Sequence, residues 1–340
     1  MIKKIIRGLI LLVLVLAGLL VVWWFLPANT PDIQVKDRNA LSTIDYINLG
    51  GVEQSVLIRS KDTHNPILLF LHGGPGMPLM YLAHDFQKPL ENDFTVVQWD
   101  RRGAGKTYVR NQPTSASMNI RQLINDAYAL IDTLRHRYHQ KKVILVGHSF
   151  GTYLGSIMVH ENPALFRAYI SVGQVVDSEK ARSLQEKFIR HEARLRGERD
   201  IIDKLNKTPN LSLEHWLFEF GGELKHSTSF YPLIWSGIQA PEYTLAEVLK
   251  VAQASAFSSS HMKYNVLKQS IYEEIRDYDV PIYFFVGTAD YTTPHELITK
   301  YYHMINAPEK KIIYFDNSAH FPFFEEPDKF CAEIKRVLTH

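Results

Sequence analysis

The sequence of 340 residues has a single cysteine, Cys331. One thiol cannot form an internal disulfide, and it cannot supply a cluster of thiolate metal ligands. The sequence also lacks the H-E-x-x-H pattern of zinc peptidases, the glycine-rich loop that binds nucleotides and the acidic loop that binds calcium. We therefore expect neither a metal nor another cofactor, and we interpret Cys331 as a small packing residue.

An excess of charge of either sign is also absent. Lysine and arginine number 38, and aspartate and glutamate number 36. Three of the basic residues, Lys3, Lys4 and Arg7, lie at the N-terminus, which leaves 35 basic residues against 36 acidic ones in the remaining chain. Such a chain lacks the basic face that holds a phosphate backbone, so nucleic acid is not an expected partner.

Charged residues are missing entirely from one stretch, the 19 residues from Gly8 to Leu26. As a helix these residues would measure about 28 Å, close to the hydrocarbon thickness of a bilayer. Basic residues precede the stretch, and Trp23 and Trp24 lie near its end, as in membrane-spanning helices. We therefore predict a single-pass membrane anchor at residues 8–26, with a cytoplasmic N-terminus and the remaining chain extracytoplasmic. The alternative is a cleaved signal peptide, whose apolar stretch is usually shorter, about 7 to 15 residues.

A serine flanked by glycines follows a predicted buried strand near the middle of the chain. Residues 143–146 are aliphatic and lead into the sequence G-H-S-F-G at 147–151. In this pattern the glycines permit a sharp turn from strand to helix, which leaves the serine hydroxyl exposed. The run from Thr152 to Glu161 has few helix breakers and is typical of the helix that follows such a turn. Ser149 is therefore the candidate nucleophile.

A serine hydroxyl is a weak nucleophile at neutral pH, so it needs a histidine base and a carboxylate that orients the base. Asp290 follows the predicted strand 280–286, and His320 lies in the loop after the predicted strand 310–315. Where a serine lies in such a turn, the order along the chain is serine, acid and then histidine. Asp290 is therefore the candidate acid, and His320 is the candidate base.

Other residues fit these two roles less well. Asp316 also follows a strand and is the alternative acid. The competing histidines are His295 at the start of a predicted helix, His303 within that helix, and the terminal His340.

The third requirement is a pair of hydrogen-bond donors for the oxyanion that forms during acyl transfer. The apolar strand 67–71 ends in the sequence H-G-G-P-G at 72–76, where glycines let backbone N–H groups approach an oxygen closely. The N–H groups of Gly74 and Phe150 are the candidate donors. We interpret His72 as a hydrogen-bonded structural residue.

Strands and helices alternate along most of the chain after a predicted hairpin around Gly50 and Gly51. This order predicts an α/β fold with a mostly parallel central sheet and helices on both faces. Such sheets bind ligands beyond the C-terminal ends of their strands. The predicted parts are an anchor at 1–26, a linker at 27–42, a first core segment at 43–173, a helical cap insertion at 174–278 and a second core segment at 279–340.

About a hundred residues separate the strand that ends near Val172 from the strand that begins at Val280, too many for a simple crossover. Helix-like runs and many aromatic residues predict that this segment is a helical cap over Ser149. A substrate with a protonated amine would need carboxylates from the cap, because a buried charge without a partner is unfavourable. The candidates are Glu214, Glu219, Glu223 and Glu242.

Taken together, several motifs resemble those of a known enzyme family. They are H-G-G-P-G at 72–76, W-D-R-R-G-A-G at 99–105, the turn at Ser149, G-T-A-D at 287–290 and His320. They are similar to motifs of the α/β-hydrolases of the prolyl aminopeptidase (proline iminopeptidase) group. The resemblance runs from about Val52 to the C-terminus. It implies an α/β-hydrolase fold, the triad and oxyanion donors assigned above, and hydrolysis of an N-terminal aminoacyl bond without a cofactor.

Two features depart from that group. Phe150 stands where many members have tryptophan, and residues 216–219 match only loosely the A-W-x-x-W-E stretch whose glutamate holds the substrate amine. By this resemblance Glu219 is the candidate substrate-binding residue, and Arg101 and Arg102 have a structural role.

The leading hypothesis is a serine hydrolase of the aminopeptidase type, acting on small molecules or short peptides that begin with proline or a small residue. A carboxylesterase or other small-acyl hydrolase is the first alternative. The second is a membrane-tethered binding protein without catalytic activity.

Overall fold

The computed structural model describes residues 2–25, 28–33, 39–208, 211–267 and 270–338. Within these ranges, eight strands form one sheet in the order β1-β2-β4-β3-β5-β6-β7-β8. The strands are β1 (Leu41–Leu49), β2 (Val52–Ser60), β3 (Ile67–Leu71), β4 (Thr95–Asp100), β5 (Val143–His148), β6 (Phe166–Val172), β7 (Ile282–Gly287) and β8 (Lys310–Phe315). The pairs β1–β2 and β2–β4 are antiparallel and the other neighbouring pairs are parallel, which confirms the predicted sheet.

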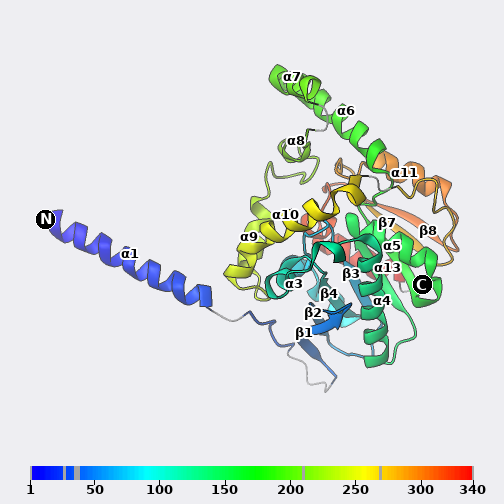
Figure 1. Ribbon diagram of the computed structural model, residues 1–340, viewed down its shortest axis with the longest axis horizontal. Helices are drawn as coiled ribbons and strands as arrows, with labels where there is room; N and C mark the ends of the chain where they lie inside the picture. The colour runs from blue at the N-terminus through cyan, green and yellow to red at the C-terminus, as the bar shows by residue number, and fades with distance from the viewer. Residues whose placement is uncertain (1, 26–27, 34–38, 209–210, 268–269, 339–340) are drawn as a thin grey trace.

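Helices surround this sheet (Figure 1). They are α1 (Ile2–Phe25), α2 (Ala83–Phe86), α3 (Gly105–Arg110), α4 (Ile120–Arg137), α5 (Phe150–Glu161), α6 (Ser178–Arg196), α7 (Arg199–Lys207), α8 (Glu214–Glu219), α9 (Tyr231–Gln239), α10 (Leu245–Leu267), α11 (His295–Met304), α12 (Pro322–Glu325) and α13 (Pro327–Leu338). The order of strands and helices is that of an α/β-hydrolase fold.

The central strand β3 explains how both faces of the sheet are covered. All five of its residues are buried. Successive side chains of a strand point to opposite faces. Accordingly, Leu69 and Leu71 pack into a core with residues of α4, α5 and α11, whereas Leu68 and Phe70 pack into a second core with residues of α2 and α13. A strand that is apolar at every position is therefore what a sheet between two helical layers requires.

Helices α6 to α10 lie between β6 and β7 and form the predicted helical cap insertion (Figure 1). Part of this insertion has an apolar cluster of its own, contributed by α6, α7 and α8 and the residues beside them. Trp216 and Phe220 belong to that cluster, so these two aromatic residues form part of the interior of the insertion. The boundaries of the predicted parts remain predictions, although β1 already begins at Leu41, inside the predicted linker.

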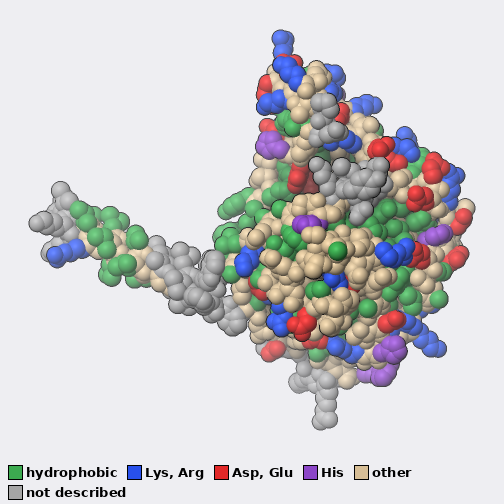
Figure 2. All heavy atoms as spheres, viewed as in Figure 1, with side chains coloured by type: hydrophobic (Ala, Val, Ile, Leu, Met, Phe, Trp, Pro, Cys, Tyr) green, Lys and Arg blue, Asp and Glu red, His purple; other side chains and the backbone are tan. Residues whose placement is uncertain are grey.

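The N-terminal helix α1 extends from one side of the molecule, and its described side chains are largely apolar (Figures 1 and 2). Nevertheless, none of the helices in the described ranges is long and apolar enough to cross a membrane. The helix includes Lys3, Lys4 and Arg7, and its uncharged part, residues 8–25, measures about 27 Å against a hydrocarbon core of about 30 Å. Leu26 lies outside the described residues.

The prediction of a membrane anchor at residues 8–26 is therefore wrong. The predicted membrane location, with a cytoplasmic N-terminus and an extracytoplasmic remainder, is corrected with it, because both rested on that anchor. The error arose because the length of the uncharged run was taken as the length of an apolar helix. The helix that forms begins at Ile2 and takes in the three basic residues.

Candidate active site

Ser149 lies in a strained turn between β5 and α5. Its φ is +52° and its ψ is −124°, a conformation that residues other than glycine rarely adopt. The turn requires glycine on both sides of the serine. A Cβ on Gly147 would lie 2.9 Å from the Gly151 carbonyl oxygen, and a Cβ on Gly151 would overlap the Leu71 carbonyl oxygen. The G-x-S-x-G pattern therefore has a steric cause, the close passage of α5 across the end of β3.

Backbone hydrogen bonds hold this turn in place. The Ser149 N–H donates to the Val172 carbonyl at 3.0 Å, and the Thr152 N–H donates to the Ser149 carbonyl at 2.7 Å. The Ser149 side chain is half-buried and borders two adjoining cavities. No group in the described part of the chain hydrogen-bonds its hydroxyl. The hydroxyl is thus free to meet a ligand in either cavity.

Asp290 and His320 form a buried pair. The distance from His320 Nδ1 to Asp290 Oδ2 is 2.9 Å, and the two side chains are 2% and 1% exposed. Thr293 supports the carboxylate, since its N–H and its hydroxyl each donate to it at 2.8 Å. Burial is the largest influence on the pKa of His320 and lowers it, but the Asp290 carboxylate, together with Glu223 and Glu325, raises the pKa above its ordinary value. An imidazole held through Nδ1 keeps Nε2 as the proton acceptor, and His320 borders the larger cavity with Ser149.

The ends of β6, β7 and β8 bring these residues together. A Cβ on Gly287 would overlap the Ala319 carbonyl oxygen, so the loops that carry Asp290 and His320 are packed directly against each other. Gly173, at the end of β6, has a φ of +60°, and a Cβ there would lie 2.9 Å from His320 Cε1. Only glycine therefore leaves room for the imidazole at this point.

The alternative residues lie elsewhere. The exposed Asp316 carboxylate is 3.9 Å from Lys329 Nζ. His295 begins α11 and His303 lies within that helix, and neither residue borders the cavities at Ser149. His340 lies outside the described residues.

His148, which precedes the serine, is a site residue that the sequence analysis did not single out. Its Nε2–H donates to the His320 backbone carbonyl at 2.9 Å, and the two ring centroids are 4.7 Å apart. Burial, followed by the nearby His320, lowers the pKa of His148 well below its ordinary value, so the ring is neutral. His148 therefore fixes the loop that carries His320, and its position beside Ser149 was its only signal in the sequence.

The two candidate oxyanion donors lie beside Ser149. Gly74 has a φ of +104°, and a Cβ there would overlap the Gly76 nitrogen, so this turn requires glycine. Gly74 borders both cavities, and its N–H has no hydrogen-bond partner among the described residues. Phe150 borders the smaller cavity as the first residue of α5, where N–H groups lack intrahelical partners and carry partial positive charge.

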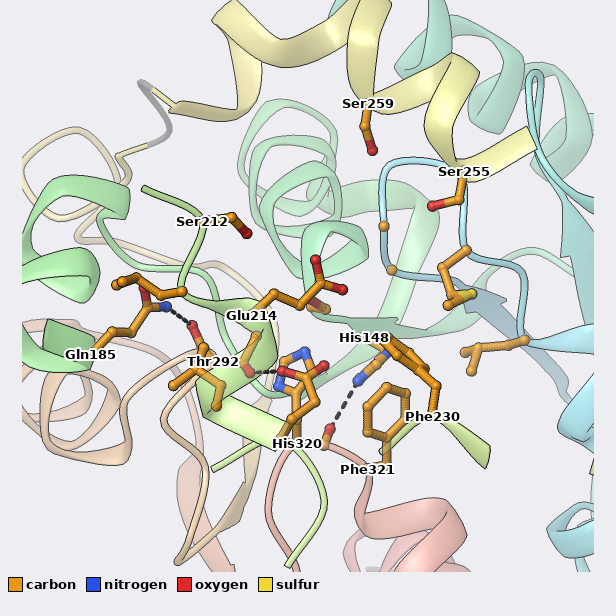
Figure 3. Close-up of a pocket in the computed structure, with 18 of the residues that line it drawn as sticks. His148, Gln185, Ser212, Glu214, Phe230, Ser255, Ser259, Thr292, His320 and Phe321 are labelled. Atoms are coloured by element: carbon orange, nitrogen blue, oxygen red, sulfur yellow. Dashed lines mark hydrogen bonds between the residues drawn. The ribbon is translucent and has the colours of Figure 1, made fainter. Parts of the chain in front are cut away.

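The larger cavity has a volume of about 560 Å³, within the range of small-molecule sites. The strand ends form one side of it, and the cap insertion forms the other. Figure 3 shows Glu214 pointing from the insertion toward the middle of the cavity, with Ser255 and Ser259 of α10 across from it. Phe230 and Phe321 border it on another side.

Glu223 is a second carboxylate in this cavity and is only 7% exposed. The Thr292 hydroxyl donates to its carboxylate, and its backbone carbonyl accepts from the His320 N–H at 3.0 Å. Burial raises the pKa of Glu223 to about 8 against the opposing effect of His320, and Asp290 and Glu214 add to the rise. A buried carboxyl in such surroundings gains most from a cationic partner.

The predicted substrate-binding residue Glu219 does not border this cavity, and its carboxylate lies 3.7 Å from His215 Nε2. Residues five apart on a helix point about 140° apart, so Glu214 and Glu219 occupy different faces of α8. Glu242 accepts a hydrogen bond from Thr30 and borders a separate, smaller cavity. Of the four candidate carboxylates, the structure therefore brings only Glu214 and Glu223 to the cavity at Ser149.

A second cavity, of about 460 Å³, adjoins the first at Ser149. Its walls come largely from the start of α6 and the start of α11. The residues that it shares with the larger cavity are Gly74, Ser149, Arg182, Gln185 and Thr292. Ser149 is thus at the junction of two compartments.

No group of three or more histidine, cysteine, aspartate or glutamate side chains is arranged to hold a metal ion in the part of the chain that the structure describes. Cys331 is buried, and its thiol lies 3.1 Å from the Phe86 carbonyl oxygen. It therefore packs in the interior between α13 and α2.

Comparison with known proteins agrees with this fold. Residues 68–333 match the Alpha/beta hydrolase family, which is more than half of the chain. The chain belongs to the alpha/beta hydrolase family. The matched range begins in β3 and ends in α13, so it includes the loop of Gly74, the turn at Ser149 and the loop of His320.

Two related proteins are named as an aminopeptidase and an iminopeptidase, and the solved structures of similar fold also include epoxide hydrolases. A probable aminopeptidase of Bacillus subtilis, YbaC, is 29% identical over 317 residues, which cover 90% of this hydrolase and 99% of the relative. A proline iminopeptidase of Heyndrickxia coagulans is 21% identical over 284 residues, which cover 80% and 90% of the two chains. The crystal structure of a proline iminopeptidase-related protein from Thermus thermophilus has a TM-score of 0.65 at 18% identity and covers 88% of this chain and 98% of its own. The solved structure supports the fold alone.

Proposed function

We propose that this protein is a serine hydrolase that removes N-terminal residues from short peptides, with Ser149 as nucleophile, His320 as general base and Asp290 orienting that base. The observation that carries the proposal is one cavity bordered by Ser149, His320 and two carboxylates, Glu214 and Glu223. The relatives named as aminopeptidase and proline iminopeptidase support the same reaction class.

In the first half of the reaction, Ser149 Oγ attacks the carbonyl carbon of the scissile bond while His320 Nε2 takes the hydroxyl proton. The carbonyl oxygen becomes an oxyanion, which accepts hydrogen bonds from the N–H groups of Gly74 and Phe150. When this intermediate collapses, the carbon–nitrogen bond breaks and His320 gives its proton to the leaving amine. An aminoacyl ester of Ser149 remains.

In the second half, a water molecule attacks the ester carbonyl and gives a proton to His320. Collapse of the second intermediate breaks the bond to Ser149 Oγ, which recovers its proton from His320. A free amino acid leaves and the starting enzyme is restored. Asp290, whose carboxylate lies 2.9 Å from His320 Nδ1, accepts the hydrogen bond from that nitrogen and stabilises the imidazolium.

The carboxylates suit the free amine of such a substrate. A peptide α-amine has an unperturbed pKa of about 7.7 to 8.0, so it carries a positive charge over most of the neutral range. An ammonium group beside Glu223 favours the ionised form of that carboxyl and offsets the cost of burying both groups. We propose that Glu214 and Glu223 hold this amine and that the insertion at 174–278 is the cap that excludes water from Ser149.

The two compartments suit the two halves of a cleaved peptide bond. In the larger cavity the acyl residue would lie between the strand ends and Glu214. In the smaller cavity Val175, Val176 and Leu297 would accept the leaving part of the peptide. These three residues form an apolar part of the wall, which would favour a leaving residue with an apolar side chain.

Labelling with a fluorophosphonate probe tests the nucleophile. We expect the probe to modify Ser149, located by mass spectrometry, and we expect Ser149→Ala to lose both labelling and hydrolysis. Hydrolysis at the wild-type rate by Ser149→Ala would refute the mechanism.

Three matched substrates test the reaction class: a free prolyl or alanyl arylamide, its N-acetyl form, and a short-chain acyl ester. We expect the free arylamide to be cleaved and acetylation to remove most of the activity, because it deletes the cation that the carboxylates hold. Equal rates on the free and acetylated compounds, or faster cleavage of the ester than of either, would favour a carboxylesterase instead.

A further inference from the structure

Arg101 is a buried cation that the proposed reaction leaves without a role. It directly follows β4 and is 0% exposed. No ion pair joins its guanidinium to a carboxylate in the described part of the chain, and its Nε and Nη1 atoms lack hydrogen-bond partners there. Burying a guanidinium without a counter-charge is costly. Stability of the fold is therefore a poor explanation for this residue.

Arg102 shows what a stabilising arginine looks like at the next position. Its guanidinium forms a bidentate ion pair with the buried Asp126 carboxylate, at 2.8 and 3.1 Å, and also donates to the Gly50 carbonyl at 2.9 Å. The two neighbouring arginines thus point to different partners. Arg102 ties the hairpin turn to α4, whereas Arg101 reaches the oxyanion loop.

The Arg101 side chain holds the carbonyl of Gly73. Its Nη2 donates to the Gly73 oxygen at 3.1 Å and lies 3.5 Å from the Pro75 oxygen. The Arg101 backbone N–H donates to His72 Nε2 at 3.2 Å, which places the ring proton on Nδ1. That Nδ1–H lies 2.9 Å from the same Gly73 oxygen, and it is 3.0 Å from Arg101 Nη2. Two neighbouring donors therefore converge on one carbonyl.

This carbonyl belongs to the peptide group that also contains the Gly74 N–H. In a trans peptide the C=O and N–H point in opposite directions across one plane, and the described residues include no cis peptide. Holding the Gly73 oxygen toward Arg101 therefore turns the Gly74 N–H away from Arg101. Because a glycine loop has wide conformational freedom, the orientation of the Gly73–Gly74 peptide must be fixed by hydrogen bonds from outside the loop.

Arg101 also contacts the second half of the candidate oxyanion hole. Its Cζ lies 5.3 Å from the centroid of the Phe150 ring, and the N–H of Phe150 is the other candidate donor. Burial lowers the pKa of Arg101 to about 9, so the guanidinium is still charged at neutral pH. A fixed positive charge beside the Gly73 carbonyl and the Phe150 ring favours negative charge on an oxygen bound nearby.

We infer that Arg101 is a positioning residue for the oxyanion hole: together with His72 it holds the Gly73 carbonyl so that the Gly74 N–H faces the carbonyl oxygen of the substrate. The inference rests on the proposed function, because Gly74 acts as an oxyanion donor only if Ser149 attacks a carbonyl group. Arg101 itself touches neither substrate nor nucleophile.

Kinetics of Arg101→Met, Arg101→Lys and the matched control Arg102→Lys test the inference. For Arg101→Met on the free aminoacyl arylamide we expect kcat to fall about 100-fold, as when one oxyanion donor is lost, with KM within about threefold. Arg101→Lys keeps the charge and one donor, so we expect it to recover part of that loss and remain about tenfold below wild type. Arg102→Lys should lower the melting temperature and leave kcat within about twofold.

A transition-state analogue separates positioning from a general loss of structure. We expect the affinity of an α-aminoboronic acid, in which boron replaces the carbonyl carbon, to fall in Arg101→Met by about the same factor as kcat/KM. The affinity of the free amino acid product should be unchanged. A rise in KM at constant kcat would overturn the inference, because it would place Arg101 in substrate binding.

The outcomes for the two proposals are distinct. If the fluorophosphonate fails to label wild-type Ser149, the proposed function fails. If the wild type is labelled and both Arg101 variants are labelled and turn over at the wild-type rate, only the role of Arg101 is overturned. If Arg101→Met does not fold, kcat of Arg101→Lys is compared with kcat of Arg102→Lys. Equal kcat values for these two variants would overturn the positioning role of Arg101.

Discussion

The two sides of the larger cavity are built differently. On the side of the sheet, Ser149, Asp290 and His320 each follow the end of a strand, and Asp290 and His320 are almost completely buried and hydrogen-bonded to each other. On the side of the insertion, Glu214 is exposed and begins a helix of six residues, and Ser255 and Ser259 lie on a long helix that crosses the cavity. The sheet therefore holds its site residues in buried, hydrogen-bonded positions, whereas the insertion presents its polar side chains from the surfaces of helices.

The packing of the two sides also differs. Strands β5, β7 and β8 belong to the cores of the sheet, whereas α6, α7 and α8 contribute most of a separate apolar cluster. The two sides meet at Phe218 of α8, which packs in the second core of the sheet, and at Tyr291, which packs against the cluster. This difference supports our proposal that the sheet carries the reaction and the insertion selects the substrate.

Removing the base from the sheet side should have the largest effect. We expect His320→Ala to lower kcat by about a thousandfold or more, because loss of one triad member removes the proton transfer in both halves of the reaction. The variant should still be folded at the assay temperature, which a measurement of its melting temperature checks. If the variant keeps more than a tenth of the wild-type kcat, His320 is not the base, and the reaction does not depend on the sheet side as proposed.

Changing the insertion side should alter selectivity instead. We expect Glu223→Gln to lower kcat/KM for a free aminoacyl arylamide by about 10- to 100-fold, since a charge partner worth a few kcal/mol is lost, and to leave an acyl ester unaffected. Glu219→Gln is the matched control, because that carboxylate faces His215 and does not border the cavity. If the control loses as much activity as Glu223→Gln, Glu219 regains the role that the sequence predicted.

The titration of His320 measures the electrostatic part of the sheet side. In wild type we expect its ring signals in NMR of carbon-labelled histidine to titrate above pH 6.5, since Asp290, followed by Glu223 and Glu325, raises its pKa against the effect of burial. In Asp290→Asn burial acts without the carboxylate, so the pKa should drop by about one to three units and lie below 6.5. His148, whose pKa is lowered, serves as an internal reference that stays neutral. An unchanged His320 midpoint in the variant would contradict the pairing.

The last prediction concerns stability rather than rate, namely its dependence on pH. The pKa of Glu223 is about 8 in the folded protein against an ordinary value of 4.5, so between these values the folded state holds one more proton than the unfolded state. The stability from this group is complete below about pH 4.5 and is lost as the pH rises toward 8. Urea unfolding between pH 5 and 8 should show the free energy of unfolding of wild type falling relative to Glu223→Gln, by up to about 1.4 kcal/mol per pH unit. A constant difference between the two proteins would show that Glu223 is ionised throughout.

The sheet side of the site could be predicted from the sequence because its signals are local. Gly147 and Gly151, on either side of Ser149, leave no room for a Cβ, so the G-x-S-x-G pattern is required by the turn. Asp290 and His320 each follow a run of apolar strand residues. The parallel order of the strands then places all three residues at the same edge of the sheet. Local patterns and one rule of topology were sufficient.

The insertion side could not be predicted in this way, because its geometry depends on how helices without a fixed register pack. The choice between Glu214 and Glu219 depends on the rotation of α8 about its axis, which no local pattern sets. The same holds for partners distant in the chain: His148 reaches a carbonyl 172 residues away, and Arg101 reaches a loop 28 residues before it. The N-terminal helix shows a related limit: the sequence did not indicate that the helix begins at Ile2 and so includes the basic residues.

The distance along the chain between Ser149 and His320 has a consequence for the newly made protein. The serine turn is synthesised 171 residues before the histidine. At about 5 to 20 residues per second, roughly 10 to 30 s pass between the synthesis of Ser149 and that of His320. If His320 is the base, as we propose, the growing chain has no activity during that interval, and activity requires β7 and β8 to have joined the sheet beside β6.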